Sequence, residues 1–222
     1  MNASDIDIGA CIVAEADGLV VVNKPPGICS TGKDLNDPEC VQALLVSYYW
    51  KPVWALHQLD KDTSGINLFV RKKSLVDVWK TKMQEGGRKE YLAICRGRFG
   101  HERLRVDAPL GWIEAERGYG VTLDGKPAAT EFELLSQGED ASLLRCRLLT
   151  GRTHQIRLHL GHVGHPLLGE NRYLDPPCRR HRRQALHAAR LSFEGGPTYS
   201  APLPDDLRTL AQREGLSVPE GW

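Results

Sequence analysis

The stretch SGINLFVRKKSLVDVWKTKMQEGGRKEYLAICRG, residues 64–97, determines the predicted fold class. Its first segment alternates in polarity, with Ile66 and Leu68 on one side, which is the period of a strand. Residues 74–87 then place a helical segment between a serine and two glycines, the usual signals for the two ends of a helix. Residues 88–97 return to strand-type residues. This succession of strand, helix and strand predicts a protein that mixes both elements.

The flanking sequence extends the same pattern. LVVVNKPPG (19–27) is typical of a buried strand that runs into a forced turn. Further strands are predicted at 53–59, 130–137, 142–150 and 185–193, and helices at 37–50 (Asp37 as N-cap, Pro38 first), 153–164 (Thr153 as cap) and 204–215. Strands dominate and hairpins are common, so the fold class is α+β with a mixed, largely antiparallel sheet. We expect one catalytic domain over 10–213, with tails at 1–9 and 214–222.

The composition is that of an ordinary globular protein, with 41% apolar and 26% charged residues in a chain of 222. No window has the roughly 20 apolar residues that span a bilayer, and the N-terminus lacks the features of a secretory signal. Six cysteines without a CxxC pair and eight histidines without an HExxH pattern predict reduced thiols and no metal site. We therefore expect a cytoplasmic, monomeric protein without membrane contact.

The charges are unevenly distributed along the chain. Residues 1–70 carry 4 basic and 9 acidic side chains, whereas residues 71–110 carry 11 basic and 5 acidic ones. A local basic surface is compatible with a phosphate backbone as partner, although such charges are commonly just a solvated face.

Asp60 lies in HQLDKDTSG, residues 57–65, between two predicted strands. Loops at strand ends often carry catalytic groups because a rigid scaffold holds them. A carboxylate is ionised at neutral pH and belongs to the known classes of enzymatic nucleophile. Asp60 is therefore a candidate nucleophile, and the alternative is that Asp60 and Asp62 only form a polar turn.

A second polar cluster lies in LLTGRTHQIRLHL, residues 148–160, where Arg152, His154 and Arg157 follow a strong strand. If a helix begins here, Arg157 lies at the margin of its apolar face and points into a pocket. A guanidinium there can pair with a buried carboxylate through two hydrogen bonds. The alternative is a polar helix start with solvated side chains.

Two further segments are candidates for contacts with RNA. RKEYLAICRG places Lys89 and Tyr91 on one face of a strand, where Tyr91 could stack on a base or simply pack in the sheet. CRRHRR, residues 178–183, holds four arginines after a proline-rich stretch. It could follow phosphates or be a solvated, mobile loop.

In combination these segments resemble the RluA-type family of RNA pseudouridine synthases. The resemblance is carried, in the family's order and over most of the chain, by VVNKPPG, HQLDKDTSG, KEYLAICRG, AATEFELL, LLTGRTHQIRLHL, GHPLLGENRY, LHAARLSF and SAPLPDDL. It implies a pseudouridine synthase fold with a central bent sheet and a cleft across it. It also implies an isomerase that converts uridines in tRNA or rRNA to pseudouridine without a cofactor.

The resemblance also assigns roles to individual residues. Asp60 would be the nucleophile, Tyr91 would stack on the target base, and Arg157 would pair with Asp60. The remaining candidates for substrate or RNA contacts are Lys24, His57, Gln58, Leu59, Thr63, Lys89, Arg152 and His154. Gln58 departs from the family, in which many members have an arginine that reaches into the space of the flipped base.

Two rival functions remain open at this stage. A non-catalytic RNA-binding relative would bind RNA without modifying it. A nucleosidase or glycosidase would need a second carboxylate for acid–base work, and only Asp62 lies near Asp60 in the sequence.

Overall fold

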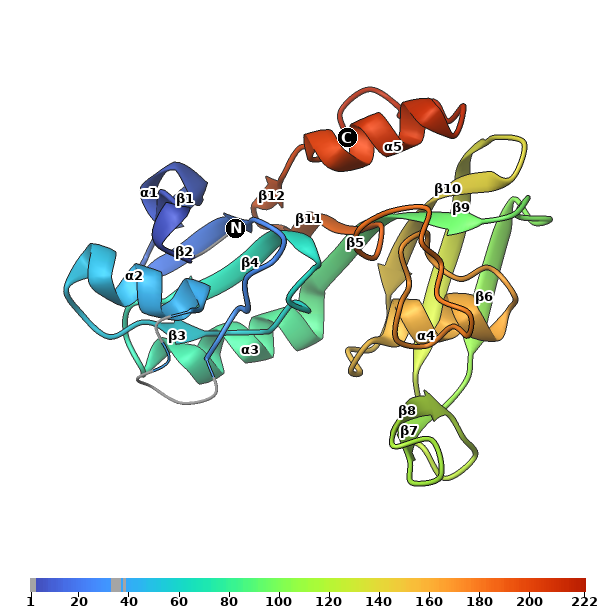
Figure 1. Cartoon of the computed structure of the whole chain (residues 1–222). Helices are drawn as coiled ribbons and strands as arrows, with labels where there is room; N and C mark the ends of the chain where they lie inside the picture. The colour runs from blue at the N-terminus through green and yellow to red at the C-terminus, as the bar shows by residue number, and fades with distance from the viewer. Residues whose placement is uncertain (1–2, 33–36, 38) are drawn as a thin grey trace. The chain divides into compact units, whose positions relative to one another are not determined.

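The computed structural model describes residues 3–32, 37 and 39–222. Its fold class is α+β, with a large and mostly antiparallel sheet, which confirms the prediction (Figure 1). The chain divides into two compact units, residues 1–89 with 188–202 and residues 90–187 with 203–222. The predicted catalytic domain at 10–213 with its two tails stays a prediction.

The first unit contains two hydrophobic layers around a buried sheet. Its elements are η1 (Ala3–Asp5), α1 (Ile8–Cys11), β1 (Ile12–Ala16), β2 (Leu19–Lys24), α2 (Val41–Tyr49), β3 (Trp54–Ala55), β4 (Ser64–Val70), α3 (Leu75–Gly86) and β12 (Thr198–Ser200). Two more strands, β5 (Gly87–Arg96) and β11 (Leu186–Phe193), contribute residues to both units. The hydrogen-bonded order here is β1-β2-β4-β11, while β3 pairs with β4 and β12 with β11.

Strand β2 is apolar on both sides because helices cover both faces of the sheet. Val20 and Val22 belong to a cluster that also holds Leu45 of α2. Leu19 and Val21 point the other way, into a cluster against which α3 packs. The continuous apolar run of the sequence is therefore a fully buried strand, as predicted.

The close packing of β4 on β11 depends on Gly65. This residue has φ +111, and a Cβ atom added there would lie 2.2 Å from the carbonyl oxygen of Ala188. Only glycine, without a side chain, permits this approach of two backbones. The glycine that ends HQLDKDTSG is thus required by the sheet.

The second unit combines an antiparallel sheet with a small hairpin. Its elements besides β5 and β11 are β6 (Arg103–Asp107), β7 (Leu110–Ile113), β8 (Gly118–Val121), β9 (Ala129–Gln137), β10 (Ala141–Leu148), α4 (Gln155–His162) and α5 (Asp205–Arg213). The sheet order is β5-β10-β9-β6, and β7 pairs with β8. Leu158 of α4 packs with Leu110 and Ala128. This contact fixes α4 against the region of the hairpin.

Most predicted elements are confirmed, but several boundaries are wrong. Residue 40 rather than Asp37 caps α2, because the Cys40 sulfur accepts the N–H of Ala43. His154 rather than Thr153 precedes α4, in a left-handed conformation with φ 54. The strand predicted at 53–59 is reduced to Trp54–Ala55. Pro38 lies outside the described residues.

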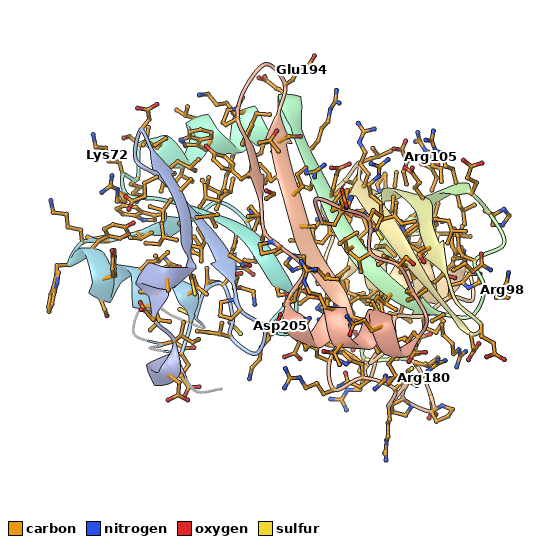
Figure 2. All side chains as sticks on the ribbon, turned by 90° about the horizontal axis from the view of Figure 1, so that it is seen from above. Lys72, Arg98, Arg105, Arg180, Glu194 and Asp205 are labelled. Carbon is orange, nitrogen blue, oxygen red and sulfur yellow. The ribbon has the colours of Figure 1, made fainter. Side chains whose placement is uncertain are left out.

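The basic segment 178–183 is largely engaged in ion pairs. The buried Arg183 donates to both carboxylate oxygens of Asp206 at 2.7 and 3.0 Å. Arg180, labelled in Figure 2, pairs with Asp140 at 2.6 Å and also with Glu214. Burial alone would raise the pKa of Asp206, but hydrogen bonds from His181 and Arg183 lower it overall. The buried Arg183 thus fits neither of the two alternatives, a solvated loop or one that follows phosphates, and Arg180 is held by two acids.

The structure also describes the state of the cysteines and the length of the helices. All six cysteines are free thiols. Across the part of the chain that the structure describes, every helix is too short or too polar to cross a bilayer.

Candidate active site

Asp60 lies on a turn between β3 and β4. The backbone N–H of Thr63 donates to the Asp60 carbonyl at 3.0 Å, which closes the turn over Lys61 and Asp62. Asp60 is partly buried, whereas Thr63 is only 2% exposed. The turn that was predicted from the polar residues therefore exists, and its position is set by contacts on both sides.

Lys24 fixes the turn through its buried ammonium group. Its side chain is fully buried, and its ammonium donates to the carbonyls of Pro25, Ile28 and Lys61 at 2.9, 2.8 and 3.0 Å. The N–H of Gly27 donates to the same Lys61 carbonyl at 2.9 Å. A buried charge is costly unless it is hydrogen-bonded in this way. Lys24 thus joins the KPPG segment to the residue after Asp60.

Ser30 and Thr31 hold the residues before Asp60. The Ser30 hydroxyl accepts the N–H of Leu59 at 2.9 Å and lies 3.4 Å from the Leu59 carbonyl. The Gln58 amide donates to the Thr31 hydroxyl at 2.8 Å while its side chain stays exposed. The 24–31 segment therefore holds the chain on both sides of Asp60, and its contact before Asp60 includes Gln58, the position that departs from the family.

His57 connects the same turn to β4. Its Nε2 accepts the backbone N–H of Leu68 at 3.2 Å, and the Asn67 amide donates to the His57 carbonyl at 3.0 Å. Burial, assisted by the charge of Lys89, lowers the pKa of His57 to about 3. His57 is consequently a neutral, structural hydrogen-bond acceptor at physiological pH.

Lys89 and Tyr91 lie on β5, two residues apart and thus on one face of the strand. Tyr91 is 7% exposed. Burial lowers the pKa of Lys89, whose ammonium has no hydrogen bond or ion pair to any residue that the structure describes. An amine in this state favours a negatively charged ligand, since pairing would offset its desolvation.

Gln155 organises the start of α4. Its Oε1 accepts from the Thr150 hydroxyl at 2.8 Å and from the Arg152 N–H at 3.0 Å. Its Nε2 donates to the Ala129 carbonyl and to the Thr130 hydroxyl, both at 2.9 Å. A buried amide that uses both ends fully fixes the GRT turn against β9.

His159 of α4 extends this network through Thr130, which Gln155 also contacts. Its Nε2 lies 3.0 Å from the Ala108 carbonyl, which can only accept, so Nε2 carries the proton. Its Nδ1 lies 2.9 Å from the Thr130 hydroxyl. Burial lowers the pKa of His159. His159 is therefore neutral and positions α4.

Arg157 is held by a buried acid that the sequence analysis did not assign. Its Nε and Nη2 each donate to one oxygen of Glu170 at 2.8 Å, and the two side chains are 6% and 2% exposed. Burial alone would raise the pKa of Glu170, but the Arg157 hydrogen bonds outweigh it and keep the pKa below its ordinary value. The predicted two-hydrogen-bond pair of Arg157 with a buried carboxylate is thus present, with Glu170 as the partner.

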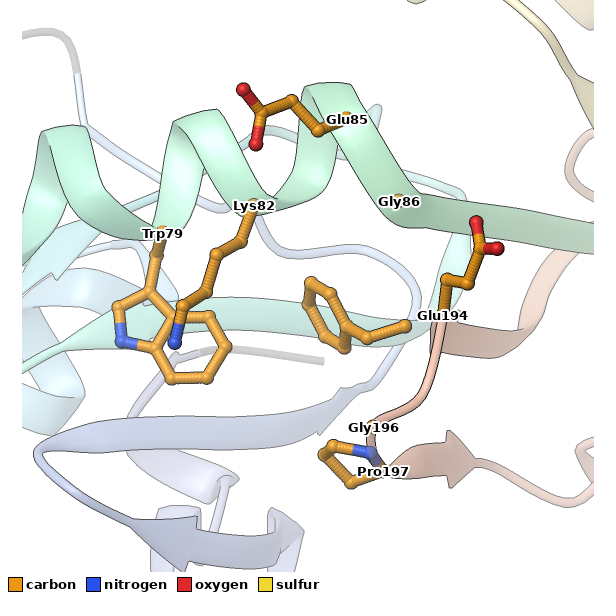
Figure 3. Close-up of a pocket in the computed structure, with 8 residues that line it drawn as sticks. Trp79, Lys82, Glu85, Gly86, Glu194, Gly196 and Pro197 are labelled. Carbon is orange, nitrogen blue, oxygen red and sulfur yellow. The ribbon is translucent and has the colours of Figure 1, made fainter.

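The first unit also contains a hollow of about 370 Å³ (Figure 3). Trp79 and Phe193 meet edge to face at 5.5 Å, and the Lys82 ammonium lies 4.6 Å from the centre of the Trp79 ring. Glu85 and Glu194 also line the hollow. None of the predicted site residues lines this hollow, so it is not part of the candidate site.

The predicted residues are thus gathered into two groups. Lys24, His57, Gln58, Leu59, Asp60 and Thr63 surround one turn of the first unit, together with Ser30 and Thr31, which the sequence analysis missed. Arg152, His154 and Arg157 surround the start of α4 in the second unit. The sequence analysis also missed Glu170. This residue is the only acid in the motif GHPLLGENRY, and that fact could have identified it as a candidate. The pairing of Asp60 with Arg157 and the role of Tyr91 stay predictions.

Among residues 3–32, 37 and 39–222, no group of three or more His, Cys, Asp or Glu side chains could hold a metal ion.

The fold and these two groups of residues define the class of protein. The model of the RNA pseudouridylate synthase family matches residues 18–162, a span that includes both Asp60 and Arg157. The chain therefore belongs to the RNA pseudouridylate synthase family, whose members are isomerases.

Individual relatives agree with this assignment. The chain is 34% identical over 220 residues to the uncharacterized RNA pseudouridine synthase YlyB of Bacillus subtilis, covering 90% of this chain and 71% of the relative. It is 34% identical over 222 residues to the ribosomal large subunit pseudouridine synthase C of Escherichia coli O157:H7, covering 91% and 69%. The solved structure of human RNA pseudouridylate synthase domain containing 4 superposes with a TM-score of 0.77 at 22% identity, covering 98% and 97%, which supports the fold.

Proposed function

We propose that this protein isomerises a specific uridine of ribosomal RNA to pseudouridine, with Asp60 as the nucleophile. The family membership supports the reaction, and the name of the E. coli relative supports rRNA over tRNA as the substrate. The role of Asp60 is supported by the hydrogen bonds that fix its turn: Lys24 and Gly27 donate to the Lys61 carbonyl, and Ser30 accepts the N–H of Leu59. Such preorganisation favours a reactive carboxylate, because the entropic cost of positioning it is met on folding and does not add to the reaction barrier.

The proposed chemistry keeps every atom of the substrate. The carboxylate of Asp60 attacks the ribose at C1′, or assists a glycal-like route, and the bond from C1′ to N1 breaks. The uracil rotates and a bond from C1′ to C5 forms; in the nucleophilic route the bond from C1′ to the Asp60 oxygen breaks in this step and frees the carboxylate. The C5 proton then leaves and N1 gains a proton. The product therefore has the mass of the substrate, and the reaction needs no redox or metal cofactor.

Arg157 and Tyr91 complete the proposed site. Glu170 holds the Arg157 guanidinium through two parallel hydrogen bonds, and in the proposal the same guanidinium also serves a second carboxylate. In the proposal this second carboxylate is that of Asp60, and Tyr91 stacks on the uracil and assists with its C5 proton. Lys89, whose amine has a lowered pKa, contacts a phosphate of the target nucleotide.

The target nucleotide must leave its stack before it can reach a buried carboxylate, which costs a few kcal/mol. Exposed basic side chains can offset this cost by attracting the phosphate backbone. Arg98 and Arg105 project outward from the second unit, and Lys72 is exposed on the first (Figure 2).

The decisive experiment compares the wild type with Asp60→Asn and, as matched control, Asp62→Asn from the same turn. Each protein is incubated with unmodified 23S rRNA transcript and with bulk unmodified tRNA, and pseudouridine is mapped chemically. We expect one or a few sites in rRNA for the wild type and the control, and none for Asp60→Asn, which should still bind the RNA.

Other outcomes would select a rival function. A blank map for all three proteins on both substrates favours a non-catalytic RNA-binding protein. Release of free uracil favours a nucleosidase. Modification of tRNA alone would keep the reaction but replace the proposed substrate.

A further inference from the structure

The second unit contains a pocket of about 520 Å³ between β8, α4 and residues 170–175. This volume falls within the roughly 300–1,000 Å³ typical of sites for small ligands. Every residue that lines the pocket belongs to the second unit, and Tyr91, the proposed stacking partner of the target base, is not among them. Arg157, the proposed partner of Asp60, does line the pocket, so the pocket adjoins this proposed catalytic group but lacks the ring proposed to stack on the target uracil.

Flat side chains line one part of this pocket. Tyr119 comes from β8 and Tyr173 from the 170–175 segment. The guanidiniums of Arg157 and Arg172 lie over the Tyr173 ring, with their central carbons 5.0 and 5.5 Å from its centre. Aromatic rings and guanidinium planes are the surfaces on which unpaired bases of RNA stack.

The rings continue from the pocket to the surface of the hairpin. His154 lies between Tyr173 and Tyr119, with ring centres 5.4 and 6.4 Å away. Tyr119 in turn meets Trp112 edge to face at 5.6 Å, and Trp112 is 52% exposed. A row of rings that begins at an exposed tryptophan and ends in a pocket is suited to single-stranded nucleic acid.

The charges of the pocket fit a ribonucleotide better than a free base. Arg117 and Arg172 can hold a phosphate, and their side chains belong to exposed residues. Glu116 and Asp175 also line the pocket and can accept hydrogen bonds from ribose hydroxyls or base amino groups. Glu170 does not add a repelling charge, because Arg157 neutralises it.

We propose that this pocket binds one unpaired ribonucleotide of the RNA substrate, other than the target uridine. Its base stacks on the tyrosine rings and its phosphate pairs with Arg117 and Arg172. The inference rests on the proposed function in taking RNA as the partner. It goes further because it assigns a second nucleotide-binding site, which would help the enzyme to select its RNA substrate.

Gly161 offers a test that removes no existing contact. It lines the pocket on α4, and a Cβ atom added there meets nothing within 4 Å. Gly161→Phe should therefore fill the pocket in a folded protein. The matched control is Gly100→Phe, at a position of the same unit that is equally open and does not line the pocket.

The readout is fluorescence anisotropy with a fluorescein-labelled oligouridylate of ten nucleotides and its deoxyribose counterpart. We expect Gly161→Phe to weaken oligouridylate binding about tenfold, the scale of one lost stacked base, while Gly100→Phe binds like the wild type. The wild type should prefer the ribose oligomer, and the plugged variant should lose this preference. Equal affinity of all three proteins for the oligouridylate, with unchanged melting temperatures, would overturn the inference.

The arginines give a second, independent measurement. Arg117→Ala and Arg172→Ala should each reduce the slope of log affinity against log salt by about 0.7, whereas the exposed control Arg103→Ala should leave it unchanged. Unchanged slopes in both variants would contradict the phosphate contact. Because neither assay requires turnover, a failure of the proposed isomerase activity would leave these results interpretable, and the reverse also holds.

Discussion

Glu170 holds Arg157 in a buried ion pair with two parallel hydrogen bonds of 2.8 Å. The same carboxylate accepts the backbone N–H groups of Arg172 and Tyr173 at 2.9 and 3.2 Å. Glu170 therefore ties α4 to the 170–175 segment, and it restricts the orientation that the Arg157 guanidinium can adopt. An arginine constrained in this way can act on a second carboxylate without first losing side-chain entropy.

Arg157→Ala should reduce both stability and activity. It leaves the buried Glu170 carboxylate without its cation, which typically costs about 3–5 kcal/mol of unfolding free energy. The matched control is Arg105→Ala, because Arg105 makes the same two-bond contact with Asp107, but with side chains 56% and 57% exposed. Urea unfolding should show a change of less than about 1 kcal/mol for the control. Equal losses of unfolding free energy in both variants would show that burial does not increase the contribution of this ion pair to stability.

Ser30→Ala should loosen the turn that carries Asp60. The buried N–H of Leu59 would lose its acceptor at 2.9 Å, a change worth about 1–3 kcal/mol. Ser142→Ala is the control, since the buried Ser142 hydroxyl likewise accepts a backbone N–H, that of Phe99, at 3.0 Å. We expect similar losses of melting temperature but a lower kcat only for Ser30→Ala. Equal kcat values would show that the position of Asp60 does not depend on Ser30.

Folding stability should fall as the pH decreases from about 6.5 toward 3. His57 has a pKa of about 3 in the folded protein and an ordinary value of 6.5 when unfolded, so only the unfolded chain takes up the proton in this range. The slope per fully shifted group is at most about 1.4 kcal/mol per pH unit. His57→Gln should flatten the dependence of the melting temperature on pH, whereas His101→Gln, at an exposed position, should not.

Gly65→Ala should prevent correct folding of the first unit. Its Cβ would lie 2.2 Å from the Ala188 carbonyl oxygen, a contact that only a movement of β4 or β11 can relieve. Gly27→Ala is a control for backbone strain alone, because Gly27 has φ +86 but open space around its Cβ position. We expect little soluble protein from Gly65→Ala and a loss of about 1–2 kcal/mol from Gly27→Ala. A well-folded Gly65→Ala protein would show that the two strands can separate.

The sequence predicted those elements whose signals are local. The alternation of β4, the glycines after α3 and the polar turn between β9 and β10 act within a few residues, and all three agree with the structure. The starts of α2 and α4 were missed because side chains and contacts outside the expected capping residues determine them. Gln155, for example, takes up the Arg152 N–H and reaches across to Ala129, so α4 begins later than Thr153 suggests.

The candidate site shows the same division between local and distant signals. HQLDKDTSG identified the turn of Asp60, but its supports at Ser30 and Thr31 lie 29 and 27 residues from their partners. The partner of Arg157 could not be found from periodicity, since Glu170 lies beyond the end of α4 in an irregular segment. The sequence likewise left the role of Arg180 open, because its partners Asp140 and Glu214 are remote in the sequence.

Because Lys24 is enclosed, chemical labelling of its amine can detect local unfolding of the first unit. Because three carbonyls surround the ammonium and no part of the side chain reaches solvent, an amine-specific reagent should modify surface lysines such as Lys72 and spare Lys24. Labelling of Lys24 would then report the fraction of molecules in which the turn of Asp60 has come loose.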